Sequence, residues 1–192
     1  MFQSGYKASH STETALIRVH NDISTAIDNK NLAILVMLDL SSAFDTIDHC
    51  LLLEKTITGV QYFWNPPEMF SDYITDRSQM ICIDNIRSLP HPLKYGVPQG
   101  SVLGPTLFNM YFYGIGDLIR EHGLQMHQYA DDTQLYCTFK PAEITGMLSR
   151  IEGALCEIRD WLLVNKLKLN DSKTVAMILH SKYMQPPHTL VQ

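Results

Sequence analysis

The sequence is poor in cysteine, in long apolar runs and in positive charge. Its four cysteines form no CxxC pair: they are Cys50, Cys82, Cys137 and Cys156. This spacing argues against a thiolate zinc site and a disulfide framework, so we interpret them as reduced, buried cysteines of an intracellular protein. The longest apolar run, Leu32–Leu38, is too short to cross a bilayer, and residues 1–10 contain no apolar stretch typical of a secretory signal. We therefore expect no membrane partner.

The charge balance also excludes some classes of protein. Fifteen basic residues stand against 20 acidic ones, which gives a net charge of −5. Taken alone, this argues against a nucleic-acid partner, because phosphate binding needs an excess of cations on one face. The content of 45% hydrophobic residues and only 10 glycines excludes a disordered or collagenous chain. The composition indicates an ordinary globular domain.

Periodicity predicts interleaved helices and strands. Ser11 is a candidate N-cap for a helix with one apolar face, formed by Leu16, Val19, Ile23, Ala26 and Ile27. The run Leu32–Leu38 predicts a strand that is buried on both faces. Further helices are expected over 47–57, 68–76, 105–120 and 144–162. Hairpins are expected around 84–85 and from 126 to 139, and short strands on both sides of 170–173.

Acidic residues lie at the ends of the predicted central strands. Asp39 ends the first strand, and Asp131 with Asp132 joins two others. Two carboxylates about 4 Å apart repel by about 4 kcal/mol at an effective dielectric constant of 20, and a divalent cation such as Mg²⁺ relieves this repulsion. The alternative is that the Asp-Asp pair is only the solvated corner of a hairpin.

Four ordered motifs carry a resemblance to a known family. They are LDLSSAFDTIDH from Leu38, GVPQGSVLGP from Gly96, YADDTQLY from Tyr129, and Trp161 with LKLN and Lys173-Thr174. In this order they resemble motifs A to D of the reverse transcriptase of LINE-type non-LTR retrotransposons. Phe2-Gln3-Ser4-Gly5 with His10-Ser11-Thr12, and Arg77-Ser78-Gln79, resemble the family's connecting segments. The resemblance extends from residue 2 to about residue 180.

This resemblance implies a fold. We expect an α/β (α+β) polymerase palm over residues 1–180, with a central, mostly antiparallel sheet flanked by helices on one face. Residues 181–192 would form a short tail. We also expect an incomplete right-hand architecture, without most of the fingers and without the thumb.

The resemblance also implies a metal centre. Asp39 and Asp131 would hold two Mg²⁺ ions, with Mn²⁺ as an alternative, while the Leu40 carbonyl helps and Asp132 supports the cluster. These ions would promote attack of a primer 3′-hydroxyl on the α-phosphate of a nucleotide. Lys173 would lie near the triphosphate and could donate a proton to pyrophosphate, or it is a solvated turn lysine.

Other residues would contact the substrate. Phe44 would lie under the incoming sugar and exclude a 2′-hydroxyl, or it is a core aromatic. Gln99 and Gly100 would lie against the template base and the nucleotide, where a glycine permits close approach, or they form an ordinary turn. Tyr129 and Ala130 would lie beside the primer terminus.

We therefore expect RNA-templated DNA synthesis that is weak or absent in this chain alone. The implied partners are an RNA template, a DNA primer, deoxynucleoside triphosphates and other retrotransposon-encoded segments. The alternatives are a catalytically silent palm that binds nucleic acid or protein, and an unrelated Mg²⁺ phosphohydrolase.

Asp45 and Asp48 are expected to be structural caps. The eight histidines show no metal-ligand spacing. An intracellular location is expected, either cytoplasmic or nuclear.

Overall fold

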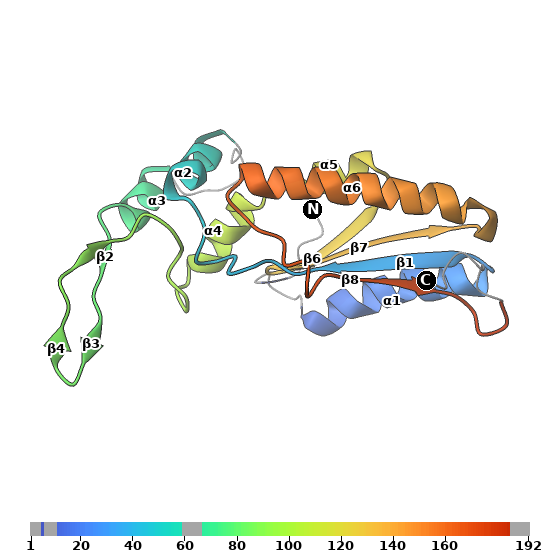
Figure 1. Cartoon of the computed structure of the whole chain (residues 1–192), viewed down its shortest axis with the longest axis horizontal. Helices are drawn as coiled ribbons and strands as arrows, with labels where there is room; N and C mark the ends of the chain where they lie inside the picture. Colours follow the sequence, from blue (N-terminus) through green and yellow to red (C-terminus); the bar gives the residue numbers. More distant parts are fainter. Residues whose placement is uncertain (1–4, 6–10, 59–66, 185–192) are drawn as a thin grey trace. The chain divides into compact units, whose positions relative to one another are not determined.

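The computed structural model describes residue 5, residues 11–58 and residues 67–184 of the chain (Figure 1). Its contacts divide the chain into two compact units. Unit 1 takes in Met1–Ser41, Gly114–Val164 and Lys168–Gln192, and unit 2 takes in Ser42–Tyr113 and Asn165–Leu167. The segment expected around Phe2-Gln3-Ser4-Gly5 lies largely outside the described residues.

Unit 1 is built on a four-stranded sheet of order β6-β7-β1-β8. Its strands are β1 (Leu32–Leu38), β6 (Gln125–Tyr129), β7 (Asp132–Phe139) and β8 (Val175–Leu179). Every pairing is antiparallel, with β1 in the centre between β7 and β8. The predicted mostly antiparallel sheet is thus confirmed, and β1 begins and ends where the apolar run does.

Helices cover both faces of this sheet (Figure 1). The helix α1 (Thr12–Asp28) packs on the face that carries Ala33 and Tyr136. The helices α5 (Ile115–Glu121) and α6 (Ile144–Val164) lie on the other face, and the 3₁₀ turn η1 (Pro141–Glu143) precedes α6. The expectation of helices on one face only is wrong, because both sets of alternating residues along β1 are apolar and need cover.

The start of α1 follows its sequence. Ser11 caps the helix by accepting a hydrogen bond from the Thr14 N–H, and Thr14 returns the bond in a capping box. Val19 and Ile23 are buried against the sheet, whereas Leu16, also predicted on this face, is 57% exposed. The packed face of α1 therefore begins one turn later than the periodicity indicates.

The described residues of unit 2 form three helices and a long hairpin. The helices are α2 (His49–Thr58), α3 (Pro67–Ile74) and α4 (Gly104–Tyr111). The hairpin pairs β2 (Ser78–Gln79) with β5 (His91–Pro92), and β3 (Cys82–Ile83) with β4 (Ile86–Arg87). Asp84 and Asn85 both have positive φ and form its two-residue turn, as predicted.

Two further expectations need correction. The single helix expected over 105–120 is two helices, α4 and α5, because Gly114 at φ 104° interrupts the helical backbone and precedes α5. The four cysteines are free thiols, as expected, but only Cys137 is buried. Cys50, Cys82 and Cys156 are exposed.

Candidate active site

The register of the sheet brings acidic residues to one end of unit 1. The last β1–β7 pair is Leu38 with Thr133, so Asp39 and Asp132 follow one step further along the same two strands. Partial burial and then the charges of Asp131 and Asp39 raise the pKa of Asp132. The structure therefore brings the three predicted carboxylates within electrostatic reach of one another.

The tip of the β6–β7 hairpin sets the position of Asp131. The tip consists of Ala130 and Asp131, while Asp132 pairs with Tyr129 and is already part of β7. Ala130 is buried with φ 58°, a left-handed conformation that is uncommon for alanine. The Gln128 side chain holds it by donating to the Ala130 carbonyl at 2.9 Å. This tip is therefore a constrained turn rather than a loose solvated corner.

A second turn brings Lys173 close to Asp39. The Asn170 carbonyl accepts hydrogen bonds from the Lys173 N–H at 3.1 Å and from both the N–H and the hydroxyl of Thr174. The Asn170 N–H donates to the Asp39 carbonyl at 2.8 Å, which ties this turn to the end of β1. The Lys173 ammonium lies 4.0 Å from an Asp39 carboxylate oxygen. Because both groups are partly exposed, the ion pair itself adds little stability.

Leu40 lies beside the start of the turn that carries Lys173. It forms an isolated antiparallel bridge with Leu169, and the bridging hydrogen bonds come from the flanking residues. In such a pair, the N–H and C=O of Leu40 itself point away from Leu169. Its side chain is buried, so Leu40 anchors the strand end beside Asp39.

The remaining predicted site residues belong to unit 2. Phe44 stacks on Phe108 with ring centroids 4.7 Å apart, and Phe108 stacks on Phe112 in turn. Phe44 is partly buried and combines a core contact with an accessible side. Its carbonyl accepts a hydrogen bond from the Val97 N–H at 2.9 Å. Motif A residues are thus held to the glycine-rich loop of motif B.

Gly96 completes this attachment. Its N–H donates to the Ile47 carbonyl at 2.8 Å, and its own carbonyl accepts a hydrogen bond from the His49 ring at 2.7 Å. Because a carbonyl only accepts, the His49 Nε2 must carry the proton. Gly96 has φ 83° and lies against the Asp45 backbone. We refer to the contacts of residues 44–49 with residues 96–97 as the loop clamp.

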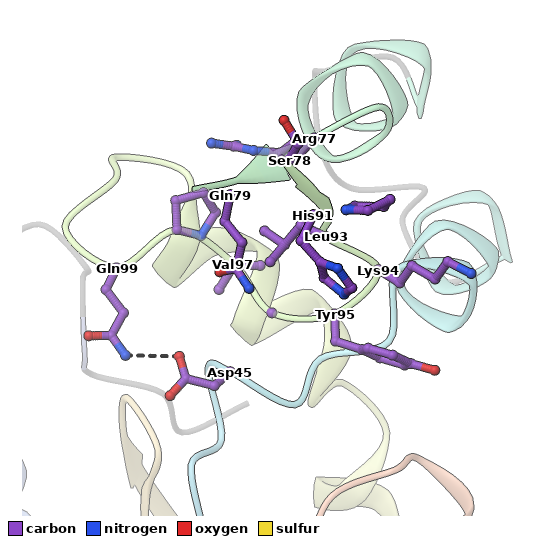
Figure 2. Close-up of a pocket in the computed structure, with 13 residues that line it drawn as sticks. Asp45, Arg77, Ser78, Gln79, His91, Leu93, Lys94, Tyr95, Val97 and Gln99 are labelled. Atoms are coloured by element: carbon purple, nitrogen blue, oxygen red, sulfur yellow. Dashed lines mark hydrogen bonds between the residues drawn. The ribbon is translucent and has the colours of Figure 1, made fainter. Parts of the chain in front are cut away.

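Gln99 and Gly100 follow the loop clamp. The Gln99 side-chain nitrogen donates to Asp45 Oδ1 at 2.9 Å (Figure 2). Gly100 has φ 76°, and a Cβ built there would meet nothing within 4 Å. Within this chain, the glycine at position 100 is therefore required by the backbone conformation and not by a close neighbour.

A cavity of about 850 Å³ opens beside these residues within unit 2 (Figure 2). Its lining joins the base of the hairpin to the motif B loop and mixes charged, polar and apolar side chains. Among them are Asp45, Arg77, Gln79, His91, Val97 and Gln99.

Sequence reasoning missed or misassigned several of these contacts. Asp48 is a cap, as expected, because its carboxylate accepts from the Leu51 N–H at 3.0 Å. Asp45 is not a cap, since it binds Gln99. The histidine spacing indicates no role for His49, yet its ring supports Gly96. The known turn preference of asparagine could have indicated Asn170, whereas nothing in the sequence indicates His49.

The donor set of the acidic end suits a hard cation. Carboxylate and carbonyl oxygens are the ligands that Mg²⁺ prefers. The pKa of Asp132 is raised first by partial burial and then by the charges of Asp131 and Asp39, and a bound cation would offset the repulsion among these charges. In the part of the chain that the structure describes, no three His, Cys, Asp or Glu side chains are arranged as a ready metal-binding group. The chemistry of the site therefore fits the metal, although the side chains are not preassembled around one.

No helix among the described residues is both long and apolar enough to span a membrane.

Comparisons with known proteins agree with the motifs. The family model for reverse transcriptase (RNA-dependent DNA polymerase) matches residues 1–188. The chain is 30% identical over 180 residues to the RNA-directed DNA polymerase from mobile element jockey of Drosophila melanogaster. This match covers 90% of the present chain and 19% of the jockey protein. It is 27% identical over 195 residues to the probable RNA-directed DNA polymerase from transposon X-element of the same species. This second match covers 99% of the present chain and 21% of the X-element protein. The chain thus spans about a fifth of the length of these relatives.

Solved structures agree on the fold. Apo telomerase from Candida tropicalis, truncated from its C-terminal domain, superposes with a TM-score of 0.67 at 15% identity, over 95% of this chain and 37% of that one. At this identity the likeness concerns the fold alone. The family model, which matches residues 1–188, shows that the chain belongs to the reverse transcriptase family.

Proposed function

We propose that this chain carries the catalytic carboxylates of an RNA-directed DNA polymerase that transfers deoxynucleotides to a primer. The observation that supports this most directly is the convergence of Asp39, Asp131 and Asp132 at one end of the sheet, in a chain of the reverse transcriptase family. A hairpin corner in solvent would not need a buried, left-handed Ala130 or a second turn that delivers Lys173 beside Asp39.

Asp39 and Asp131 would hold two Mg²⁺ ions, or Mn²⁺ in their place, with the Leu40 carbonyl as a further ligand and Asp132 as support. Bound there, the metal supplies Lewis-acid chemistry that favours attack of the primer 3′-hydroxyl on the α-phosphate and stabilises the leaving pyrophosphate. The carboxylates themselves orient the ions and keep the site anionic. The Asn170–Asp39 backbone hydrogen bond, 2.8 Å long, fixes the strand end from which Asp39 extends.

The other residues have roles in binding. Lys173 would hold the triphosphate and donate a proton to pyrophosphate, and Tyr129 with Ala130 would bound the primer terminus. Phe44 would exclude a 2′-hydroxyl by its ring, whose other face is fixed against Phe108. Gln99 and Gly100 would contact the template base and the incoming nucleotide.

The corresponding partners are an RNA template, a DNA primer, deoxynucleoside triphosphates and further segments encoded by the same element. This DNA synthesis would take place inside the cell. Net charge is −5, so we expect other, basic segments to supply most of the phosphate contacts.

Primer extension on an RNA template tests the proposal. We expect Asp39→Ala to abolish extension because it removes a metal ligand, whereas Glu152→Gln, an exposed carboxylate on α6, should leave it unchanged. Phe44→Ala should admit ribonucleotides. Extension by Asp39→Ala at the wild-type rate would refute the role assigned to this carboxylate.

Metal binding can be measured separately from catalysis. Titration calorimetry with Mn²⁺ or Mg²⁺ should show binding in the millimolar range, with a smaller heat for Asp131→Asn. Equal heats for both proteins would contradict the metal assignment. Metal and primer-template binding without any extension would instead favour the catalytically silent palm.

A further inference from the structure

The hydrogen bond between Gln99 and Asp45 links the two motifs at the edge of the cavity in unit 2. Gln99 Nε2 lies 2.9 Å from Asp45 Oδ1, and both residues are exposed (Figure 2). Neither the fold of the loop nor the cap of α2 requires this contact. The loop clamp holds the backbone through Phe44 and Ile47, and Asp48 supplies the α2 cap. Within the described residues, the hydrogen bond that the Asp45 carboxylate accepts comes from Gln99.

The chemistry of the pair fixes which end of the carboxamide faces outward. An ionised carboxylate can only accept hydrogen bonds, while a glutamine side chain presents a donor nitrogen and an acceptor oxygen. The nitrogen of Gln99 must therefore face Asp45, and the oxygen must point away from it. Figure 2 shows this arrangement, with the Gln99 oxygen on the side remote from Asp45. Without an acceptor-only neighbour, the amide could turn over and present either end.

We propose that Asp45 is a positioning residue that sets the hydrogen-bonding polarity of Gln99 toward the nucleic-acid substrate. The inference rests on the proposed function, in which Gln99 contacts the template base or the incoming nucleotide. With one N–H of the amide bound to Asp45, the Gln99 oxygen faces away from Asp45 and can accept a hydrogen bond from a hydroxyl or amino donor of the substrate. The second N–H is then the one donor left to Gln99, so its capacity to bind a phosphate oxygen is reduced. Asp45 thereby determines what Gln99 can recognise, without touching the substrate itself.

Single-nucleotide primer extension on an RNA template, with the deoxynucleotide as the titrated substrate, tests this role. Asp45→Ala should raise KM about two- to tenfold, the range expected for one lost hydrogen bond, while kcat changes by less than about twofold. Asp45→Glu keeps an acceptor-only carboxylate and should recover most of the wild-type KM. Asp72→Ala, which removes another exposed carboxylate of unit 2, is the matched control and should leave KM unchanged.

A double-mutant cycle shows whether Asp45 acts through Gln99. In the Gln99→Ala background, Asp45→Ala should have no further effect on KM, because the group that it positions is gone. The side-chain amide protons of Gln99, observed by NMR and assigned by their loss in Gln99→Ala, should shift in Asp45→Ala and not in Asp72→Ala.

The outcomes distinguish the positioning role of Asp45 from the proposed polymerase function. If the wild-type chain extends the primer and the two substitutions are additive, or Asp45→Glu fails to rescue, the inference is overturned and the proposed function stands. A lower unfolding midpoint together with a lower kcat in Asp45→Ala would show a structural role and also overturn it. If the wild-type chain extends no primer, polymerase activity of this chain by itself is refuted, and the NMR measurement decides the inference: unshifted Gln99 amide protons in Asp45→Ala would overturn it.

Discussion

Replacing Gly96 by alanine should break the loop clamp. A Cβ at this position would lie 3.0 Å from the Asp45 carbonyl oxygen and 3.2 Å from its Cα, and both are backbone atoms that no rotamer change can move. The backbone of Gly96 also has φ 83°, which strains any residue with a side chain. Relief of the clash would require residues 44–49 and residues 96–97 to separate.

The expected loss in the free energy of unfolding of Gly96→Ala has two contributions. The left-handed backbone alone costs about 1 kcal/mol for alanine, after allowance for the lower entropy of its unfolded chain. Separation would also weaken the hydrogen bonds of Gly96 to Ile47 and His49, now 2.8 and 2.7 Å long, at about 0.5–1.5 kcal/mol each. We therefore expect Gly96→Ala to lower the free energy of unfolding by about 2–4 kcal/mol.

Gly100→Ala is the matched control for this prediction. It has a similar φ of 76°, but a Cβ there meets no atom within 4 Å, so only the backbone contribution of about 1 kcal/mol remains. Urea unfolding followed by far-ultraviolet circular dichroism measures both variants, with hydrogen exchange of the Gly96 and Val97 amides as a local readout. Equal costs for the two variants, or unchanged protection of these amides in Gly96→Ala, would refute the reasoning.

Three further predictions concern other parts of the chain. Tyr136→Phe removes a 2.6 Å hydrogen bond to Asp22 and should lower the free energy of unfolding by about 1–2 kcal/mol in a urea titration; no change would contradict the bond's contribution. Burial, opposed by the charge of Glu54, lowers the pKa of Lys55 to about 8. As the pH rises, the Lys55 ammonium therefore loses its proton at a lower pH in the native state than in the unfolded chain. The stability of the wild type relative to Lys55→Met should therefore rise with pH between about 8 and 10.5, and a flat difference would argue against this shift. Ellman's reagent should label Cys50, Cys82 and Cys156 quickly in the native protein, and Cys137, whose thiol pKa is raised by burial, only after unfolding; four fast thiols would contradict the burial.

The candidate site shows where sequence reasoning reaches its limit. Because Asp39, Asp131 and Asp132 lie at the ends of predicted strands, the sequence indicates that they can meet at one edge of the sheet, and the resemblance to the reverse transcriptase motifs implies a metal centre there. The sheet register and the raised pKa of Asp132 agree with that placement. The same reasoning could not predict Gln99 bound to Asp45, since these residues are 54 positions apart and lie in loops without periodicity. It also missed the support that His49 gives to Gly96, which depends on a turn and a helix start meeting in space.

The sequence by itself determined the elements whose signals are local. The unbroken run Leu32–Leu38 specified a central strand, Ser11 specified the start of α1, and Asp84 with Asn85 specified a hairpin turn. Each depends on neighbouring side chains or on backbone conformations that particular residues favour.

Only the tertiary structure decided the rest. It placed α1 on the face of the sheet opposite α5 and α6, left Leu16 exposed, and carried Lys173 to Asp39 through the Asn170 turn. It also showed that Gly114 interrupts the helical backbone between α4 and α5. These features arise from contacts between segments far apart in the chain, and a pattern read along one segment does not contain them.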